Sequence, residues 1–327
     1  MLVGKDDSRQ IPKFYLDKID APVFDFRSPN FTTLYRQKRP NLALSVINNF
    51  SQPLLFRKSI LFVKSKIEEY CPDAVINFYE MITGVAFRTY RFDKKLNVRL
   101  ISIAHQYILL NPKYKTTSEQ DIKYYFLRMI TRVTCQCSSK ILALSFRDMP
   151  GSSEKNLVVV PPLLRQEVFD NEPTEGDYIH GYMINTGYYE EILDWHTKNP
   201  HIPIRFFWDK KDADDTTVID ENLILHRLND ELFLKSMAGS MAYATTSGFE
   251  SICEALYYKK PILMIPVHVE QEFNAYDASL SGAGISSMKF KLNKLLNFIP
   301  HYRPDENFRD WVHQAEERFI KEICETN

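Results

Sequence analysis

The sequence predicts an α/β protein built from two doubly wound, Rossmann-like domains that face each other across a cleft. Three observations indicate this class. Apolar runs of strand length alternate with helical patterns along the chain, no internal repeat is present, and 327 residues exceed one average core. A composition of 44% hydrophobic and 25% charged residues is typical of globular proteins.

The first half of the chain alternates short strands with helices. Strands are expected at 21–26, 73–79, 98–105, 140–146 and 156–162. Helices are expected at 41–50, 54–70, 80–90 and 119–137. In the helix at 54–70, apolar residues recur three and four positions apart. The alternation predicts a parallel sheet with helices on both faces.

The second half repeats this alternation after a polar segment at 165–177, which contains Pro173 and Gly176 and is the best candidate for a linker. Strands are expected at 178–184, 202–208, 222–228, 240–246 and 261–267. Helices are expected at 187–199, 230–239, 247–260 and 270–282, with a charged loop at 209–217. We therefore expect an N-terminal domain over 1–164 and a second domain over 178–300. An amphipathic terminal helix at 305–327 is expected to pack back on the first domain.

The charge balance and the missing motifs exclude several classes of protein. Lys and Arg (41) nearly match Asp and Glu (42), so no positive field attracts nucleic acid. No apolar run of about 18 residues is present, and the first residues are polar. We expect a cytoplasmic protein, or one bound peripherally at a membrane. No G-x-G-x-x-G follows a strand, and no metal site or cofactor is expected.

The stretch Thr246, Ser247, Gly248 and Phe249 lies where an expected strand ends and a helix begins. The first N–H groups of a helix have no partner within it and carry the positive end of its dipole, so they bind phosphate well. Glu254 follows Ser247 by seven residues, almost two turns, and therefore lies on the same face about 10 Å along the axis. A carboxylate there can accept hydrogen bonds from a ribose diol. The alternative is that Ser247 caps the helix and Glu254 is solvated.

A second polar group follows the next strand. His268, Glu270, Gln271 and Asn274 gather at the strand-to-helix turn after 261–267. Side chains that both donate and accept hydrogen bonds suit the hydroxyls of a sugar. The alternative is that Glu270 and Gln271 cap the helix and Asn274 packs within it.

The run at 245–275, TTSGFESICEALYYKKPILMIPVHVEQEFNA, resembles the donor-binding region of the GT-B glycosyltransferases. The shared features are a small-residue and glycine turn, "EAL" on the helix, "KP", and a following "P…Q…NA". The likeness is strongest to the branch related to the lipid II N-acetylglucosaminyltransferase, the family 28 C-terminal-like proteins. It covers roughly 178–285.

The resemblance implies a role for each matching residue. The donor diphosphate would bind at Thr246, Ser247, Gly248 and Phe249, and at Asn185, Thr186 and Gly187. The ribose would bind Glu254, the base would pass His226 and Leu228, and the sugar hydroxyls would meet Glu270 and Gln271. For His226, a structural role is an equal alternative.

The first domain is expected to carry the acceptor and any catalytic base. Glu80 and His105 each follow an expected strand, so both are expected to point into the cleft, where either could accept a proton. Either could instead be a helix cap or a structural hydrogen-bonding group. Members of the resembled family begin with a strand and a G-x-G-H loop, whereas this chain begins MLVGKDDSRQ, similar to the family's second strand. We therefore expect an incomplete N-terminal domain that lacks the first strand and loop.

The expected function is metal-independent transfer of a sugar from a nucleotide diphosphate sugar to an acceptor hydroxyl. The expected partners are the nucleotide-sugar donor and an unknown acceptor, such as a lipid-linked molecule or a glycan. One alternative is a catalytically impaired nucleotide-sugar-binding protein, and another is a nucleotide-sugar 2-epimerase. The epimerase would need acid and base carboxylates on both domain faces.

Overall fold

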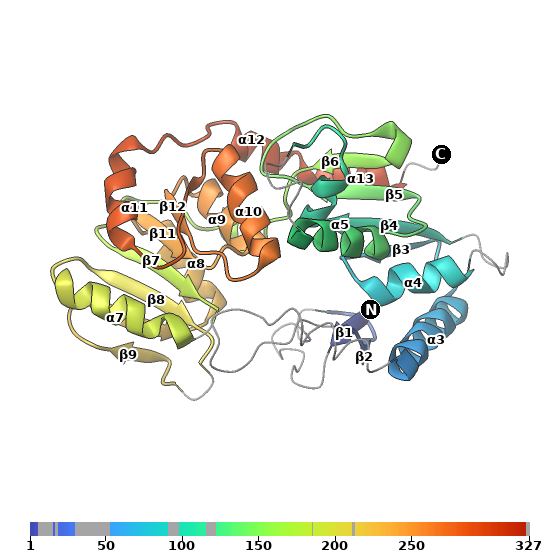
Figure 1. Cartoon of the computed structure of the whole chain (residues 1–327), viewed down its shortest axis with the longest axis horizontal. Coiled ribbons are helices and arrows are strands. Elements are labelled where there is room, and N and C mark those ends of the chain that lie inside the picture. The colour runs from blue at the N-terminus through green and yellow to red at the C-terminus, as the bar shows by residue number, and fades with distance from the viewer. Residues whose placement is uncertain are drawn as a thin grey trace.

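The computed structural model describes residues 1–5, 16, 19–29, 53–90, 98–115, 122–184, 186–210 and 213–324. These residues form two α/β lobes placed side by side (Figure 1). Each lobe contains a parallel sheet covered by helices, as the alternating pattern predicted. The helix expected at 41–50, and Asn185, lie outside the described residues.

The N-terminal lobe contains two separate parallel sheets. In the smaller sheet, β1 (Leu2–Lys5) pairs with β2 (Phe24–Arg27). The larger sheet has the order β3-β4-β5-β6, with strands Ala74–Asn77, Arg99–Ala104, Lys140–Leu144 and Leu157–Val160. The helices are α3 (Pro53–Tyr70), α4 (Met81–Tyr90) and α5 (Ile122–Thr134), and a 3-10 turn, η1, spans His105–Leu110. A cavity of about 650 Å³ lies between β1 and β3.

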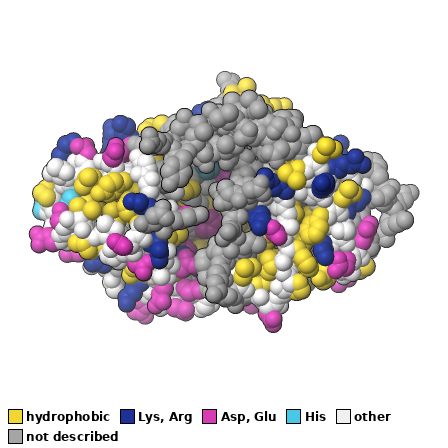
Figure 2. Space-filling view, turned by 90° about the horizontal axis from the view of Figure 1, so that it is seen from below, with side chains coloured by type: hydrophobic (Ala, Val, Ile, Leu, Met, Phe, Trp, Pro, Cys, Tyr) yellow, Lys and Arg dark blue, Asp and Glu magenta, His cyan; other side chains and the backbone are white. Residues whose placement is uncertain are grey.

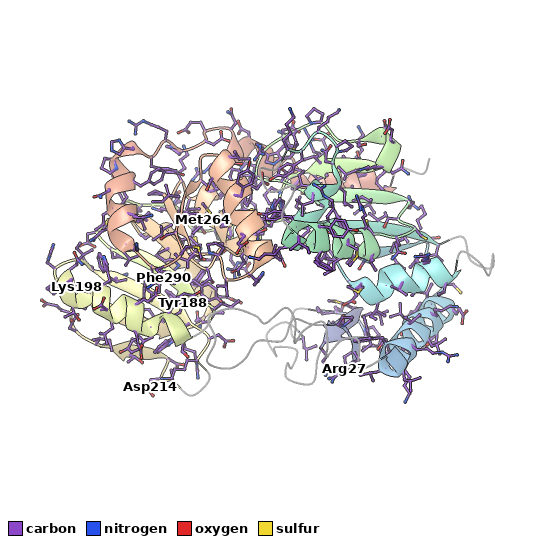
Figure 3. The ribbon with its side chains drawn as sticks, viewed as in Figure 1. Arg27, Tyr188, Lys198, Asp214, Met264 and Phe290 are labelled. Atoms are coloured by element: carbon purple, nitrogen blue, oxygen red, sulfur yellow. The ribbon has the colours of Figure 1, made fainter. Side chains whose placement is uncertain are left out.

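The second lobe contains a seven-stranded sheet with the order β13-β12-β11-β7-β8-β10-β9. The strands are β7 (Ile179–Met183), β8 (Ile204–Trp208), β9 (Thr216–Val218), β10 (Leu223–Arg227), β11 (Ala242–Thr245), β12 (Ile262–Met264) and β13 (Gly284–Ser286). The helices are α7 (Tyr189–Lys198), α8 (Asp230–Ala238), α9 (Phe249–Tyr257), α10 (Val269–Leu280) and α11 (Leu292–Phe298). Figure 3 shows Tyr188 and Phe290 near α7, where their rings are 5.3 Å apart.

Part of the charged loop expected at 209–217 is a strand instead. Thr216–Val218 forms β9 and pairs antiparallel with β10, with Val218 opposite Ile224. The β-branched run Thr-Thr-Val favours an extended edge strand over a loop. The short elements β13 and α11 were not predicted, because each is too short to show a period.

The chain order places a topological switch point at the centre of this sheet. From β7 the chain builds outward through β8 to β10, then returns to the other side of β7 with β11 and continues to β12 and β13. Because β7 and β11 are parallel neighbours, with Tyr182 opposite Thr245, their carboxyl ends adjoin. Ligands of open α/β sheets bind at such points. The topology therefore brings 186–187 close to 246–248.

The linker and the terminal segment both pack on the lobes. The linker contains the short helix α6 (Gln166–Phe169), in which Val168 is fully buried. The single helix expected at 305–327 is, over the described residues up to 324, two helices, α12 (Phe308–His313) and α13 (Ala315–Cys324), separated at Gln314. Figure 1 shows α13 beside β5 and β6 of the first lobe. Glu322 of α13 lies 2.6 Å from Lys140 there.

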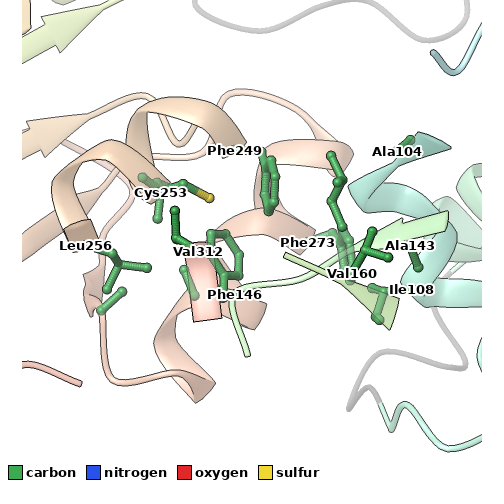
Figure 4. Packing of buried hydrophobic residues seen from close by; sticks show 14 of the residues in the cluster. Ala104, Ile108, Ala143, Phe146, Val160, Phe249, Cys253, Leu256, Phe273 and Val312 are labelled. Carbon is green, nitrogen blue, oxygen red and sulfur yellow. The ribbon is translucent and has the colours of Figure 1, made fainter. Parts of the chain in front are cut away.

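One hydrophobic cluster joins the two lobes. Phe146 and Ile108 come from the first lobe, and Phe249 and Phe273 come from α9 and α10 of the second (Figure 4). Val312 of α12 closes the cluster from the terminal segment. The N-terminus of α9 is therefore packed directly against the first lobe.

Candidate functional site

The turn between β11 and α9 has an unusual backbone. Thr246 and Ser247 are buried, and Ser247 has φ of 64°, in the left-handed region that non-glycine residues rarely occupy. Gly248 is the N-cap of α9. A Cβ at Gly248 would find Ser251 Oγ as its nearest neighbour, at 3.5 Å. The start of α9 therefore has an open side that a ligand can approach.

Hydrogen-bond donors at this turn are not all used. Thr246 Oγ1 and Ser247 Oγ are buried and have no hydrogen-bond partner among the described residues. Asn274 of α10 fixes the turn, because its Nδ2 donates to Ser247 O at 3.1 Å. Buried hydroxyls without a partner are costly and rare. Phosphate oxygens would supply acceptors both for these hydroxyls and for the free N–H groups of α9.

A cavity of about 410 Å³ adjoins the turn, a size typical of small-molecule sites. Gly248 and Glu254 both line it, whereas Ser247, which the spacing placed on the same helix face as Glu254, is buried and does not line it. Leu228 lines it from the segment after β10. The other lining residues are Leu163, Leu164, Arg165, Tyr182, Asp230, Phe233, Glu250 and Ser251.

Glu254 is buried and ion-paired, so the alternative of a solvated helix residue is wrong. Its Oε1 lies 2.8 Å from Arg165 Nε, and Arg165 Nη1 lies 3.4 Å from Asp230 Oδ1. Burial raises the pKa of Glu254, and the Arg165 guanidinium opposes that rise. The sequence reasoning missed Arg165. Its one signal is position, as a lone cation that follows the apolar run 157–164 at the domain junction.

Glu270 links the two lobes. Its Oε1 accepts a hydrogen bond of 2.6 Å from Gln106 Nε2 of the first lobe. Burial raises the pKa of Glu270 to about 7, the Gln106 hydrogen bond opposes this, and the Glu250 carboxylate adds to it. Gln271 is buried, and its Oε1 accepts from the N–H of Val267, so it braces the turn before α10. This bracing is the capping alternative for Gln271.

The remaining residues expected to bind the donor lie around the same sheet edge. Thr186 and Gly187 are exposed in the 3-10 turn η3 (Thr186–Tyr188), directly after β7. His226 is half-buried and contacts Thr216 Oγ1 at 3.1 Å, and its ring lies 5.0 Å from that of Phe207. Burial and the nearby Arg205 lower the pKa of His226. His226 thus contacts the edge strand β9, whereas Leu228 lines the cavity.

The prediction that His105 points into the cleft is wrong. Its side chain is 1% exposed and is stacked on Phe249 and Phe273, with ring centroids 4.1 and 4.9 Å apart. Its Nδ1 lies 2.8 Å from Leu144 O and donates to it. Burial lowers its pKa, and Asp277, whose Oδ2 lies 3.5 Å from His105 Nε2, opposes this fall. His105 therefore packs between the two lobes, and its ring is covered on both faces by Phe249 and Phe273.

The prediction that Glu80 points into the cleft is also wrong. Glu80 caps α4, because its Oε1 accepts from the N–H of Ile82 at 2.9 Å and from Ser28 Oγ at 2.8 Å. Burial raises its pKa. Glu80 lines the cavity between β1 and β3 and is not in the lining of the cavity at α9. The helix-cap alternative therefore describes its contacts.

The described residues include neither a candidate metal site nor a candidate membrane-spanning helix. No three His, Cys, Asp or Glu side chains in this part of the chain lie close enough together to hold a metal ion. No helix among the same residues combines the length and the apolar character needed to cross a membrane. On the face seen in Figure 2, acidic and basic side chains are interspersed over both lobes.

Two Rossmann-like domains, with a strand-to-helix turn at the switch point of the second sheet, define the GT-B fold of glycosyltransferases. The chain belongs to glycosyl transferase family 1, whose model matches residues 21–301. No curated protein matches the sequence.

Solved glycosyltransferase structures share the fold. Phytolacca americana UGT2, complexed with UDP-2fluoro-glucose and pterostilbene, is 13% identical with a TM-score of 0.59, covering 98% of this chain and 88% of that one. The glycotransferase of kitacinnamycin is 13% identical with a TM-score of 0.58, covering 98% and 87%. Arabidopsis thaliana UGT89C1, complexed with UDP-L-rhamnose, is 14% identical with a TM-score of 0.56, covering 99% and 86%.

Proposed function

We propose that this protein transfers a sugar from a nucleotide diphosphate sugar to an acceptor hydroxyl without a metal ion. One observation carries the proposal. Gly248, at the N-terminus of α9, and the Glu254 carboxylate line one cavity near the switch point of the sheet, and Gly248 directly follows Thr246 and Ser247, whose buried hydroxyls have no partner among the described residues. Amides and the helix dipole at this turn would stabilise the charge on the leaving diphosphate, the task that a cation performs in other enzymes.

The proposed roles follow the positions around this cavity. Thr246, Ser247, Gly248 and the Phe249 N–H would bind the diphosphate, with Thr186 and Gly187 opposite them across the switch point; the resemblance also implies Asn185. Glu254 would accept from the ribose hydroxyls, and Leu228 would lie against the base, with His226 behind it. Two of the similar structures are complexes with UDP sugars, which supports a nucleotide sugar as the donor.

The sugar and the acceptor would meet at the junction of the lobes. Glu270 lies on the face of α10 that also carries Asn274, one turn further on, and Asn274 contacts the phosphate turn. Its hydrogen bond to Gln106 places the Glu270 carboxyl at the boundary with the first lobe. We propose that Glu270 and Gln271 bind sugar hydroxyls and that the acceptor, a lipid-linked molecule or a glycan, approaches from the first lobe.

The motif at 245–275 supports a likeness to the lipid II N-acetylglucosaminyltransferase branch. Among the described residues, the β1-β2 sheet is separate from the β3–β6 sheet, with a cavity between β1 and β3. A second candidate function is binding of a nucleotide sugar without catalysis. It is favoured by the positions of His105 and Glu80, since neither candidate base lines the cavity at α9.

Calorimetric titration with UDP, GDP, ADP and CDP tests the site. Glu254→Ala should weaken binding of the tightest-bound nucleotide by about 1–3 kcal/mol, the contribution of hydrogen bonds to a charged group. Glu317→Ala, at an exposed position on α13, is the matched control and should leave the affinity unchanged. Equal affinity in wild type and Glu254→Ala would remove Glu254 from the site.

Incubation with a panel of nucleotide sugars and EDTA separates the two functions. Release of nucleotide in EDTA supports metal-independent transfer or hydrolysis. Tight binding with no release supports the non-catalytic binder.

A further inference from the structure

Arg165 enters the α9 cavity from outside the donor-binding domain. It follows β6 at the start of the segment that connects the two lobes. Its Nε lies 2.8 Å from Glu254 Oε1, and its Nη1 lies 3.4 Å from Asp230 Oδ1. The Arg165 side chain is 32% exposed, whereas that of Glu254 is 7% exposed. The guanidinium therefore covers the buried carboxylate from the solvent side.

Without Arg165, the side chains that line the cavity would carry only negative charges. Asp230, Glu250 and Glu254 contribute three carboxylates, and Arg165 is the one cation among the described lining residues. A nucleoside diphosphate brings further negative charge. A buried carboxylate that lacks a cation takes up a proton rather than remain charged. Arg165 is thus the group that allows Glu254 to stay ionised beside an anionic ligand.

The geometry of the pair leaves one carboxylate oxygen available. Arg165 occupies Glu254 Oε1, and Oε2 receives no hydrogen bond from the described residues. A ribose offers two neighbouring hydroxyl donors, and an ionised carboxylate is purely an acceptor. A protonated carboxyl would lose part of this capacity.

We propose that Arg165 is the positioning residue for the ribose of the donor: it keeps Glu254 ionised and oriented so that the nucleotide is selected by its ribose diol. This inference rests on the proposed function. It predicts that the wild type prefers a ribonucleotide over its 2′-deoxy analogue by about 10- to 100-fold, the effect of one hydrogen bond to a charged group. Most of that preference depends on Arg165.

The experiment compares the best-binding nucleotide among UDP, GDP, ADP and CDP with its 2′-deoxy analogue by calorimetry between pH 5 and pH 9. Arg165→Gln should reduce the ribose preference to less than threefold, and Arg165→Lys should restore part of it by returning a cation. Because the ribose binds ionised Glu254, affinity should rise with pH, and loss of the cation should move that rise to higher pH. A merely structural role would not move this profile.

The control is Arg318→Gln. Arg318 is 34% exposed and pairs with Asp148 at 3.4 Å, so it matches Arg165 in exposure and pairing but lies outside the cavity lining. This variant should keep both the ribose preference and the pH profile. Changes in Arg318→Gln equal to those in Arg165→Gln would overturn the inference.

The double variant Arg165→Gln/Glu254→Gln removes both charges and therefore avoids an unpaired buried carboxylate if Arg165→Gln folds poorly. Its affinity should equal that of Glu254→Gln, because Arg165 acts through Glu254. A further loss would show direct contact with the nucleotide and overturn the inference. The inference would also be overturned if the wild type binds a nucleotide and Arg165→Gln keeps the same ribose preference as the wild type. If no nucleotide binds the wild type, the proposed function itself fails.

Discussion

Replacing His105 tests whether this residue packs the domains or performs chemistry. In His105→Ala the imidazole is lost from its contacts with Phe249, Phe273 and Phe146, whose ring centroids lie 4.1, 4.9 and 5.0 Å away. Aromatic pairs contribute about 0.5–1.5 kcal/mol each, and the hydrogen bond to Leu144 O contributes about 1 kcal/mol. With a partly collapsed cavity, we expect the free energy of unfolding to fall by about 3–5 kcal/mol.

The comparison variant is His105→Phe, which keeps a ring of similar shape. It preserves stacking on Phe249 and Phe273 but loses the hydrogen bond to Leu144 O, so we expect a cost of about 1–2 kcal/mol. Urea unfolding followed by tryptophan fluorescence measures both costs. Nucleotide affinity should fall more in His105→Ala than in His105→Phe, because Phe249 is the first residue of α9, at the turn where we propose that the diphosphate binds.

The decisive result combines stability with turnover of a nucleotide sugar. If His105 packs the lobes, His105→Phe keeps most of the activity. The reasoning is refuted if His105→Phe unfolds within about 2 kcal/mol of the wild type yet loses turnover by 100-fold or more. That outcome would mean that the imidazole accepts a proton in the reaction.

Three further predictions concern stability. Burial raises the pKa of Glu270 to about 7, above its usual 4.3, so its contribution to stability is full below about pH 4 and is lost as the pH rises through 7. Glu270→Gln should therefore raise the melting temperature at pH 8 but not at pH 4, and equal shifts at both would contradict this. Gly284→Ala places a Cβ against Ile262 O of the neighbouring strand, so the urea midpoint should drop by the equivalent of about 1–3 kcal/mol. An unchanged midpoint would contradict this clash. Asp277→Ala removes a buried carboxylate 2.8 Å from Arg147 Nη1, and we expect a loss of about 3 kcal/mol in urea unfolding, with a loss below 1 counting against the pair.

The sequence determined the features that depend on near neighbours along the chain. Strand and helix alternation was readable because each buried element shows its own period of apolar residues. The turn at the start of α9 was readable because a strand pattern ends and a helix pattern begins there, and Gly248 and Glu254 of this segment line one cavity. The segment at 209–217 was partly misread, because only pairing with β10 makes Thr216–Val218 a strand.

The tertiary structure alone decided which side chains are available for chemistry. A strand end marked His105 as a candidate base, but Phe249 and Phe273, more than 140 residues later, cover its ring. The partner of Glu254 lies 89 residues earlier in the chain. Burial and ion pairing arise from contacts between distant segments. The spacing of apolar residues within one segment therefore does not predict them. The sequence therefore predicted the strand-to-helix turn at α9, whereas packing decided that His105 joins the lobes and that Arg165 pairs with the carboxylate of Glu254.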